Sequence, residues 1–150
     1  MEIRRLQAED YALLGAAIES LIDKEERDGG VASPGHLQRA LQNDACYFLV
    51  ALLGSTPIAY LSAFRFPAID SDSWQVYLFD IVVLEEHRRK GIASHLIKEL
   101  RTLCLKDGVL YMWLGTSLEN TAAQKAFEAT GGSRVQDTYI EYEYIFEDGA

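Results

Sequence analysis

The sequence lacks the features that membrane-spanning and secreted proteins require. Its longest uninterrupted apolar run, residues 47–53, is far shorter than the roughly 18 residues of a membrane span. The opening residues MEIRRLQAED contain no apolar core of a secretory signal. The two cysteines, Cys46 and Cys104, have no metal-ligand spacing, and we expect both to be reduced thiols. These absences predict a cytoplasmic protein without a membrane segment.

Basic residues are also scarce. The chain has 14 lysines and arginines against 23 acidic residues, which gives a net charge of −9. A nucleic-acid partner is disfavoured, because nucleic-acid-binding proteins carry basic surfaces. A cationic substrate is compatible with this charge, since acidic clefts attract cations, although solubility alone would explain it equally well. With 150 residues, the chain is long enough for one domain, residues 1–150, with a sizeable core.

Strand-like and helical patterns alternate along the chain. The alternation and the apolar runs predict strands over residues 3–6, 46–53, 58–66, 74–84 and 109–114, and one or two more within 134–146. Helical spacing predicts helices over residues 9–24, 36–42, 91–106 and 119–130, with a loop over residues 25–35. The prediction is an α/β fold with a mixed central sheet flanked by helices, antiparallel at the N-terminal strands and parallel in its centre.

A basic turn follows the long predicted strand 74–84. Arg88, Arg89 and Lys90 precede Gly91, and a small residue, Ala93, comes next but one. Glycine lets a ligand approach the backbone, and the first amides of a helix have no intrahelical partner, so this turn is suited to binding phosphate. Neither the Walker loop nor the G-x-G-x-x-G fingerprint is present. Taken alone, the turn is equally compatible with a solvated surface.

Two motifs resemble those of a known family. Arg88-x-x-Gly91-x-Ala93 resembles the acetyl-CoA signature Q/R-x-x-G-x-G/A of the GCN5-related N-acetyltransferases, and the pattern from Asn120 through Phe127 to Gly131 resembles that family's second motif. The order of predicted elements is also the family's order. Within the family, residues 78–97 and 33–52 are similar to the aminoglycoside 3-N-acetyltransferases.

The resemblance implies an enzyme that transfers acetyl from acetyl-CoA to a primary amine of a small cationic substrate, namely an aminoglycoside. It implies no metal and a possible homodimer. The backbone of three strand residues would pair with the pantetheine arm, and the amides of the basic turn would hold the pyrophosphate. The implied coenzyme-binding residues are Ile81, Val82, Val83, Arg88, Arg89, Lys90, Gly91, Ile92, Ala93, Ser94 and Asn120.

Asp80 is the candidate catalytic residue, because it is the one charge within the apolar run 76–84. An acid in such a run must be paired or must line a cleft. One interpretation is a carboxylate that caps backbone amides at an irregularity of the strand. The other is a group that binds and orients the substrate ammonium and passes its proton through water.

The acid that protonates the leaving thiolate is not evident. Many members of the family carry a tyrosine where this chain has Phe127, which cannot donate a proton. Four tyrosines are alternatives, although each also fits simple packing: Tyr111, Tyr139, Tyr142 and Tyr144. Glu141 and Glu143 share one side of a predicted strand, and the resemblance assigns them to substrate amines, with a solvated face as the alternative.

Two other functions stay open at this point. One keeps the chemistry and changes the acceptor to another amine: a polyamine, an amino acid, a peptide or a protein lysine. The absence of a tyrosine at Phe127 also leaves room for a coenzyme A-binding module without catalysis. The three histidines, His36, His87 and His95, have no metal-ligand spacing.

Overall fold

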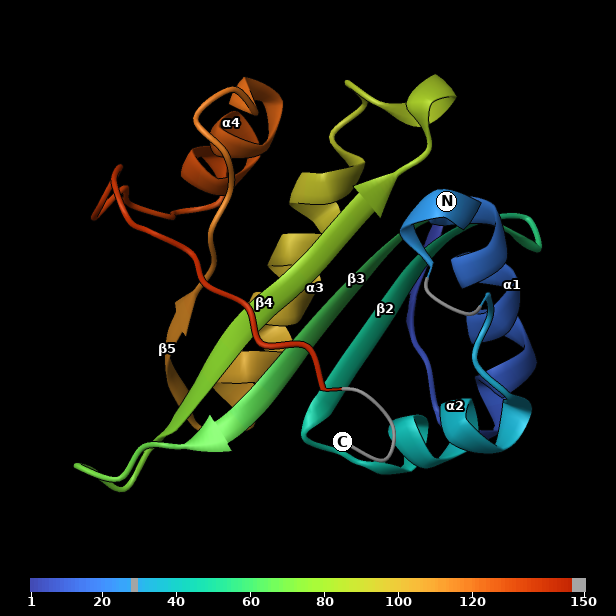
Figure 1. Ribbon diagram of the computed structural model, residues 1–150, viewed down its shortest axis with the longest axis horizontal. Coiled ribbons are helices and arrows are strands. Elements are labelled where there is room, and N and C mark those ends of the chain that lie inside the picture. The colour runs from blue at the N-terminus through green and yellow to red at the C-terminus, as the bar shows by residue number, and fades with distance from the viewer. Residues whose placement is uncertain (28–29, 147–150) are drawn as a thin grey trace.

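The computed structural model describes residues 1–27 and 30–146. Within them a single five-stranded sheet runs in chain order (Figure 1). Its strands are β1 Glu2–Arg5, β2 Cys46–Leu53, β3 Thr56–Pro67, β4 Trp74–Val83 and β5 Val109–Trp113. Neighbours from β1 to β4 are antiparallel, and β4 and β5 are parallel. The predicted mixed α/β sheet is therefore confirmed.

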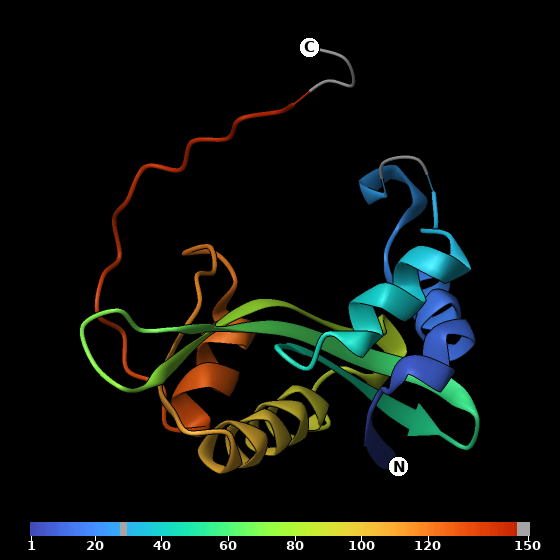
Figure 2. The same cartoon turned by 90° about the horizontal axis from the view of Figure 1, so that it is seen from below.

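Four α-helices cover the sheet in the part of the chain that the structure describes: α1 Tyr11–Leu21, α2 Pro34–Gln42, α3 Ile92–Lys106 and α4 Thr121–Ala129. Figure 2 shows α1 and α2 on one face of the sheet and α3 and α4 on the other. The predicted helix over residues 9–24 is shorter than expected, since single 3-10 turns flank α1 at Ala8–Asp10 and Lys24–Glu26. None of the described helices is long and apolar enough to cross a bilayer.

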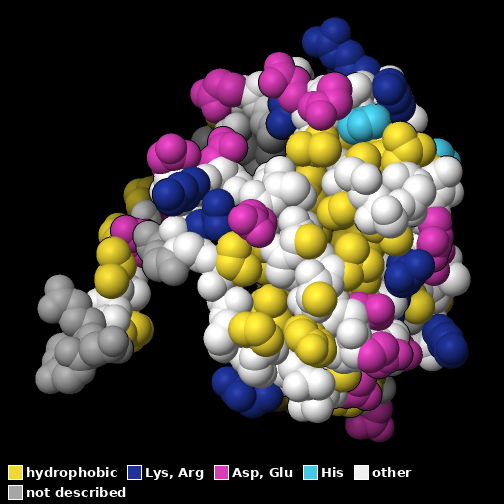
Figure 3. Space-filling view, turned by 90° about the vertical axis from the view of Figure 1, so that its right-hand side faces the viewer, with side chains coloured by type: hydrophobic (Ala, Val, Ile, Leu, Met, Phe, Trp, Pro, Cys, Tyr) yellow, Lys and Arg dark blue, Asp and Glu magenta, His cyan; other side chains and the backbone are white. Residues whose placement is uncertain are grey.

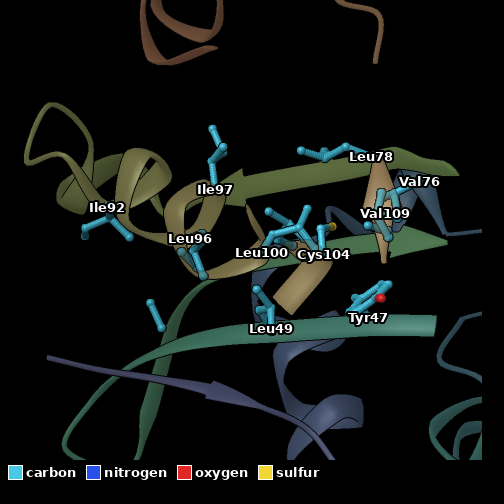
Figure 4. Close-up of a cluster of buried hydrophobic side chains, with 14 of the residues drawn as sticks. Tyr47, Leu49, Val76, Leu78, Ile92, Leu96, Ile97, Leu100, Cys104 and Val109 are labelled. Carbon is cyan, nitrogen blue, oxygen red and sulfur yellow. The ribbon is translucent and has the colours of Figure 1, made fainter. Parts of the chain in front are cut away.

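The face under α3 is closed by a hydrophobic core. Leu96 and Leu100 of α3 are fully buried against Leu49 and Val76 of the sheet (Figure 4). The buried residues of α3 recur every three or four positions, which places them in one stripe facing the strands. Each fully buried leucine contributes about 1.5–3 kcal/mol, so this core is a main source of stability.

A second core lies under α1 and α2. Leu14 and Ala17 of α1 and Leu37 of α2 pack with Val50 of β2 and Tyr60 of β3. α2 begins at Pro34, two residues earlier than predicted, and Ser33 caps it by accepting a hydrogen bond from the His36 N–H at 3.3 Å. These two helices lie over one end of the sheet and leave the rest of this face open (Figure 2).

A bulge in β4 alters which side chains reach the open face. Ser62 of β3 is opposite Asp80, whereas the next residue, Ala63, is opposite Leu78. Phe79 is therefore an extra residue without a partner on β3. Because of it, Phe79 and Asp80 both point to the side of α1 and α2, where Phe79 lies against Phe64 with ring centroids 5.9 Å apart.

The prediction of one or two strands within residues 134–146 was wrong. These residues carry no regular secondary structure and are exposed. In Figure 2 the segment leaves the sheet and projects away from the body. Alternating apolar and polar residues suit a segment to a β-strand. A strand also needs a neighbouring strand with which to exchange hydrogen bonds, and none of the described strands pairs with this segment. The predicted loop over residues 25–35 is only partly testable, because Asp28 and Gly29 lie outside the described residues.

Candidate active site

The basic turn joins the end of β4 to the start of α3. A single 3-10 turn, Glu85–His87, precedes Arg88, whose Nε donates to the Val83 carbonyl at 3.0 Å. Arg89 has a φ of 63° and Gly91 a φ of 77°, so the backbone visits the left-handed region twice within three residues. Nothing lies within 4 Å of where a Cβ on Gly91 would be, which leaves that backbone open to a ligand.

The amides of this turn are available. Among the described residues, none of the backbone N–H groups from Arg89 to Ser94 donates to a protein acceptor, and the first bond of the helix runs from the His95 N–H to the Gly91 carbonyl at 3.1 Å. No side chain caps α3. The positive end of the helix dipole adds to these donors, so the turn has the form of a phosphate site. The side chain of Ile92 is buried in the core, so only its backbone faces this site.

The outer edge of β4 is free where it approaches this turn. β4 pairs with β5 only through residues 74–77, whereas its pairing with β3 continues to Val83. Within the described residues, Ile81, Val82 and Val83 therefore have no strand on the β5 side. In Figure 1 β5 ends well before β4 does, and the two strands diverge. A ligand that extends along this edge would find unpaired backbone groups.

Asp80 has a buried tyrosine as its partner. The Tyr60 hydroxyl donates to Asp80 Oδ2 at 2.5 Å, at the bulge. Burial raises the pKa of the Tyr60 phenol far above its usual value, and the hydrogen bond to Asp80 raises it further. The phenol thus stays protonated and donates to the carboxylate. The interpretation of Asp80 as a cap for backbone amides is wrong: the irregularity exists, but a side chain is the partner.

Asp80 has no cationic partner in the part of the chain that the structure describes. The ion pairs there join Arg4 to Glu2 and Arg65 to Asp44 and Asp107. The half-buried Asp80 carboxylate therefore has one hydrogen-bond donor and no neutralising charge. Such a group attracts an external ammonium more strongly than a carboxylate that is already paired.

Aromatic rings line the open face beside Asp80. The row begins at Phe79, which is 65% exposed. The Tyr77 ring centroid lies 6.4 Å from that of Phe79 and 5.3 Å from that of Trp113. Phe66 and Tyr111 both contact Trp113 at 5.4 and 5.6 Å. Aromatic faces bind cations and the apolar faces of rings, so this row is a suitable floor for a cationic ligand. We call these five residues the aromatic floor.

The second motif supplies a helix cap and a core contact. Asn120 caps α4, and its side-chain oxygen accepts from the Ala123 N–H at 3.2 Å. Phe127 packs against the core under α3. A pocket of about 690 Å³ lies between β5, α4 and residues 131–139, and both Phe127 and Tyr139 line it.

The structure does not bring all predicted site residues together. Glu141 borders a shallow pocket with residues 115–118, and both Glu141 and Glu143 lie on the projecting C-terminal segment. No hydrogen bond or ion pair joins either glutamate to Asp80 within residues 1–27 and 30–146. Tyr142 and Tyr144 are exposed on the same segment, and Tyr111 stacks on Trp113.

Tyr60 is the site residue that sequence reasoning missed. It lies in β3, within an apolar run that predicts only packing. Its contact with Asp80 depends on the register of β3 against β4 and on the bulge. A tyrosine in the strand that precedes a strand with a lone acid is the one signal that the sequence offered.

Comparison with known proteins identifies the family. The model of the acetyltransferase (GNAT) family matches residues 6–131. Nothing among curated proteins matches the sequence. Several solved structures share the fold at low identity. One is an aminoglycoside acetyltransferase from an uncultured soil metagenomic sample in complex with sisomicin (20% identity, TM-score 0.85, covering 97% of this chain and 96% of that one).

Two further structures are similar. The aminoglycoside N-acetyltransferase AAC(6')-Iy in complex with CoA has 21% identity and a TM-score of 0.72, with 96% of this chain and 95% of that one covered. A ribosomal-protein-alanine N-acetyltransferase from Brucella melitensis biovar Abortus 2308 has 18% identity and a TM-score of 0.73, with 95% and 99% covered. At these identities the structures support the fold alone. The family model covers most of the chain, and this protein therefore belongs to the acetyltransferase (GNAT) family of enzymes, which use acetyl-CoA.

Proposed function

We propose that this acetyltransferase modifies an amine of an aminoglycoside, and that it acts on the 3-amine. The observation that carries the proposal is the Asp80 carboxylate, which has a tyrosine partner but no cation and lies beside an open aromatic floor. An aminoglycoside offers the matching chemistry, since it presents several ammonium groups on ring faces. The net charge of −9 favours the approach of such a polycation.

Coenzyme A fits the other half of the site. In our proposal the free amides of residues 89–94 hold the pyrophosphate, with Arg88, Arg89 and Lys90 beside it. The unpaired edge of β4 at residues 81–83 binds the pantetheine arm, and Asn120 lies at the mouth of α4 near that arm. Acetyl-CoA supplies the thioester. An amide of the β4 edge would donate to the developing oxyanion.

Asp80 orients the acceptor amine. A substrate ammonium bound to Asp80 loses one proton through water, and the neutral amine then forms a C–N bond with the thioester carbon. The nitrogen gives up a second proton to water, the C–S bond breaks, and the thiolate leaves with the amide as product. Tyr60 donates to Asp80 and thereby fixes the direction of the carboxylate. Phe127 cannot protonate the thiolate, so we assign that proton to water.

The similar structures support this substrate class without deciding it. One of them was solved with sisomicin, and a second carries the 6' designation in its name. The position of acetylation therefore stays a prediction, as does a cytoplasmic location. Polyamines, amino acids, peptides and protein lysines are the competing acceptors, and the ribosomal-protein-alanine enzyme has the same fold.

Release of free coenzyme A thiol tests the acceptor. We expect release from acetyl-CoA to rise with kanamycin- or gentamicin-like amines and not with peptides. NMR of the acetylated product then identifies the nitrogen. Release with peptides or polyamines alone would replace the proposed acceptor, and product acetylated at the 6' nitrogen would correct the position only.

Thermal unfolding with coenzyme A tests the cofactor half separately. Millimolar coenzyme A should raise the Tm, because a ligand that binds only the folded state stabilises it. Arg88→Ala should reduce this shift, whereas Arg4→Ala, a surface arginine of β1, should leave it intact. An unchanged Tm in the wild-type protein would contradict the site at the basic turn.

A further inference from the structure

Two polar residues are buried in the part of the chain that the structure describes, and their hydroxyl groups differ. Ser62 in β3 is 6% exposed, and Thr130 at the end of α4 is 5% exposed. The Thr130 hydroxyl donates to the Ala126 carbonyl at 2.8 Å and also lies 3.0 Å from the Phe127 carbonyl. The Ser62 hydroxyl makes no hydrogen bond to any described residue. Buried polar groups are nearly always paired, so this hydroxyl requires an explanation.

Ser62 lies on the open face directly beside Asp80. The register places Ser62 opposite Phe48 of β2 on one side and opposite Asp80 of β4 on the other. Its side chain points to the same face as that of Tyr60, two residues earlier in β3, which donates to Asp80. Opposed side chains of antiparallel strands have Cβ atoms about 4.5–5.5 Å apart. The unpaired hydroxyl is therefore a neighbour of the carboxylate that has no cationic partner among the described residues.

Asp80 keeps one oxygen free as well. Tyr60 donates to Oδ2, and no described group donates to Oδ1. Two acceptors that each lie about 2.8 Å from one tetrahedral nitrogen are roughly 4.5 Å apart, which matches the spacing of opposed side chains. The other neighbours of Ser62 are the rings of Phe48 and Phe64, whose centroids are 6.1 Å apart and which offer no competing donor.

We propose that the Ser62 hydroxyl is the second acceptor for the substrate ammonium. Ser62 Oγ and Asp80 Oδ1 would each accept one N–H bond of the same nitrogen. The carboxylate supplies the charge, and the hydroxyl fixes the direction of the nitrogen, which Coulomb attraction alone does not fix. Binding of a cation at this pair does not require acetyl transfer, whereas its part in catalysis rests on the proposed function.

This pair selects amines by their number of N–H bonds. A primary ammonium has three, so two are held and the third proton is the one that leaves through water. The neutral amine then keeps both contacts, and its lone pair points away from the two acceptors. A secondary ammonium has only two N–H bonds and must give up one contact to lose its proton. We therefore expect Ser62 to determine a preference for primary amines.

The pair can be reached from the open face. Arg65 Nε is the one side-chain polar atom of the described residues that is fully enclosed without a partner, so the Ser62 oxygen is not sealed off. α1 and α2 cover only one end of this face, and the C-terminal residues stand out from the body (Figures 2 and 3). An amine that carries a ring can thus place the ring on the aromatic floor and its nitrogen between Ser62 and Asp80.

Two amines of equal charge test the number of N–H bonds. Benzylamine and N,N-dimethylbenzylamine are both cations at pH 7 and carry the same ring, but the first has three N–H bonds and the second has one. Titration of their NMR signals with protein, without acetyl-CoA, should give about tenfold tighter binding of benzylamine, because the dimethyl compound cannot bond to both acceptors. Ser62→Ala should bring the two dissociation constants within about twofold. Asp80→Asn should weaken the binding of both.

Thermal unfolding of the free protein tests whether the hydroxyl is unpaired. Ser62→Ala should not lower the Tm, because no hydrogen bond is lost. Thr130→Val is the matched control: it removes the other buried hydroxyl, which does have a partner, and it should lower the Tm. Equal losses in the two variants would mean that the Ser62 hydroxyl is already paired in the empty protein, and would overturn the proposal.

The binding preference decides the rest. Absence of a preference for benzylamine in the wild-type protein, or a preference that Ser62→Ala leaves unchanged, would remove Ser62 from the amine site. If benzylamine binds with the expected preference but no amine supports thiol release from acetyl-CoA, the pair stands as a cation site and the proposed function fails. If thiol release occurs and the preference is absent, the function stands and Ser62 has no part in it.

Discussion

Two tyrosine–aspartate pairs lie on opposite faces of the sheet. On the closed face, the Tyr47 hydroxyl donates to Asp107 Oδ2 at 2.7 Å, and Arg65 Nη1 lies 3.0 Å from the same oxygen. On the open face, the Tyr60 hydroxyl donates to Asp80 Oδ2 at 2.5 Å. The two pairs have the same chemistry except for one charge, because Asp107 has a guanidinium partner and Asp80 has none within the described residues.

The presence or absence of a guanidinium partner assigns the two aspartates to different roles, Asp107 to stability and Asp80 to function. Arg65 and Tyr47 saturate Asp107, which closes the base of the α3 core and leaves nothing for a ligand. Asp80 keeps an unneutralised carboxylate next to exposed aromatic rings, which is unfavourable for the empty protein but suits an incoming ammonium. The carboxylate that lacks a cationic partner thus lies where a substrate ammonium can supply that partner.

Replacing each aspartate by asparagine should affect kcat/KM in only one of the two cases, and this is the largest effect that we expect. Asp80→Asn keeps an acceptor for Tyr60 but removes the charge, so we expect kcat/KM to fall about 10²–10⁴-fold. Asp107→Asn should leave kcat/KM of the folded enzyme unchanged. Thiol release measures both variants. Unchanged turnover in Asp80→Asn would remove Asp80 from the mechanism.

The loss of unfolding free energy should rank the same two variants in the opposite order, with Asp107→Asn the more damaging. Asp107→Asn removes the close anionic partner of the largely buried Arg65 guanidinium and leaves it the Tyr47 hydroxyl at 2.9 Å and the Asp44 carboxylate at 3.8 Å. The loss should cost about 1–3 kcal/mol of unfolding free energy. Asp80→Asn should cost less, because no buried cation loses its partner. Urea unfolding measures both free energies. Equal losses would mean that the two pairs are equivalent structural contacts.

The two tyrosines sharpen the comparison further. Tyr60→Phe removes the hydrogen bond that fixes the direction of the Asp80 carboxylate, so the substrate ammonium should be oriented less precisely. We expect about a tenfold loss of rate near neutral pH, a smaller effect than that of Asp80→Asn. Tyr47→Phe is the matched control, since it removes a buried phenol from the other face. A merely structural role for Tyr60 would lower the free energy of unfolding and leave kcat/KM of the folded enzyme unchanged.

Sequence patterns predicted the elements of the fold because each element is determined locally. The spacing along α3, the cap at Ser33 and the short link between β2 and β3 depend on neighbouring residues. The basic turn is equally local, and nothing lies within 4 Å of where a Cβ on Gly91 would be, as the predicted approach of a ligand to that backbone requires. Residues 134–146 show the limit: apolar and polar residues alternate there as regularly as in a strand, yet strand pairing depends on a partner that the local pattern does not identify.

The Tyr60–Asp80 contact could not be predicted for the same reason. It arises from the pairing register of two strands and from an extra residue, Phe79, that turns Asp80 toward Tyr60. A shift of one residue in that register would turn the two side chains to opposite faces. Register is a property of the assembled sheet, so the acid was visible in the sequence and its partner was not.

The smallest expected effect is the loss of the stability that Tyr47 on the closed face contributes, as the pH rises above 10. Burial, followed by the hydrogen bond to Asp107, raises the pKa of Tyr47 to about 12 from a usual value of 10.0. Below pH 10 both folded and unfolded chains hold this proton, and the contribution of Tyr47 to stability is complete. Between pH 10 and 12 the unfolded chain releases the proton while the folded chain keeps it, so that contribution is lost as pH rises.

Tyr47→Phe lacks this proton, and the comparison of its Tm with that of the wild type isolates the effect. The wild-type protein should have the higher Tm at pH 8, because its phenol bonds to Asp107 and Arg65. The difference should narrow from pH 10 to 12, whereas the other tyrosines, Tyr60 included, are common to both proteins and cancel. A difference that stays constant to pH 12 would mean that Tyr47 ionises alike in both states, and that the closed face shields it no better than solvent does.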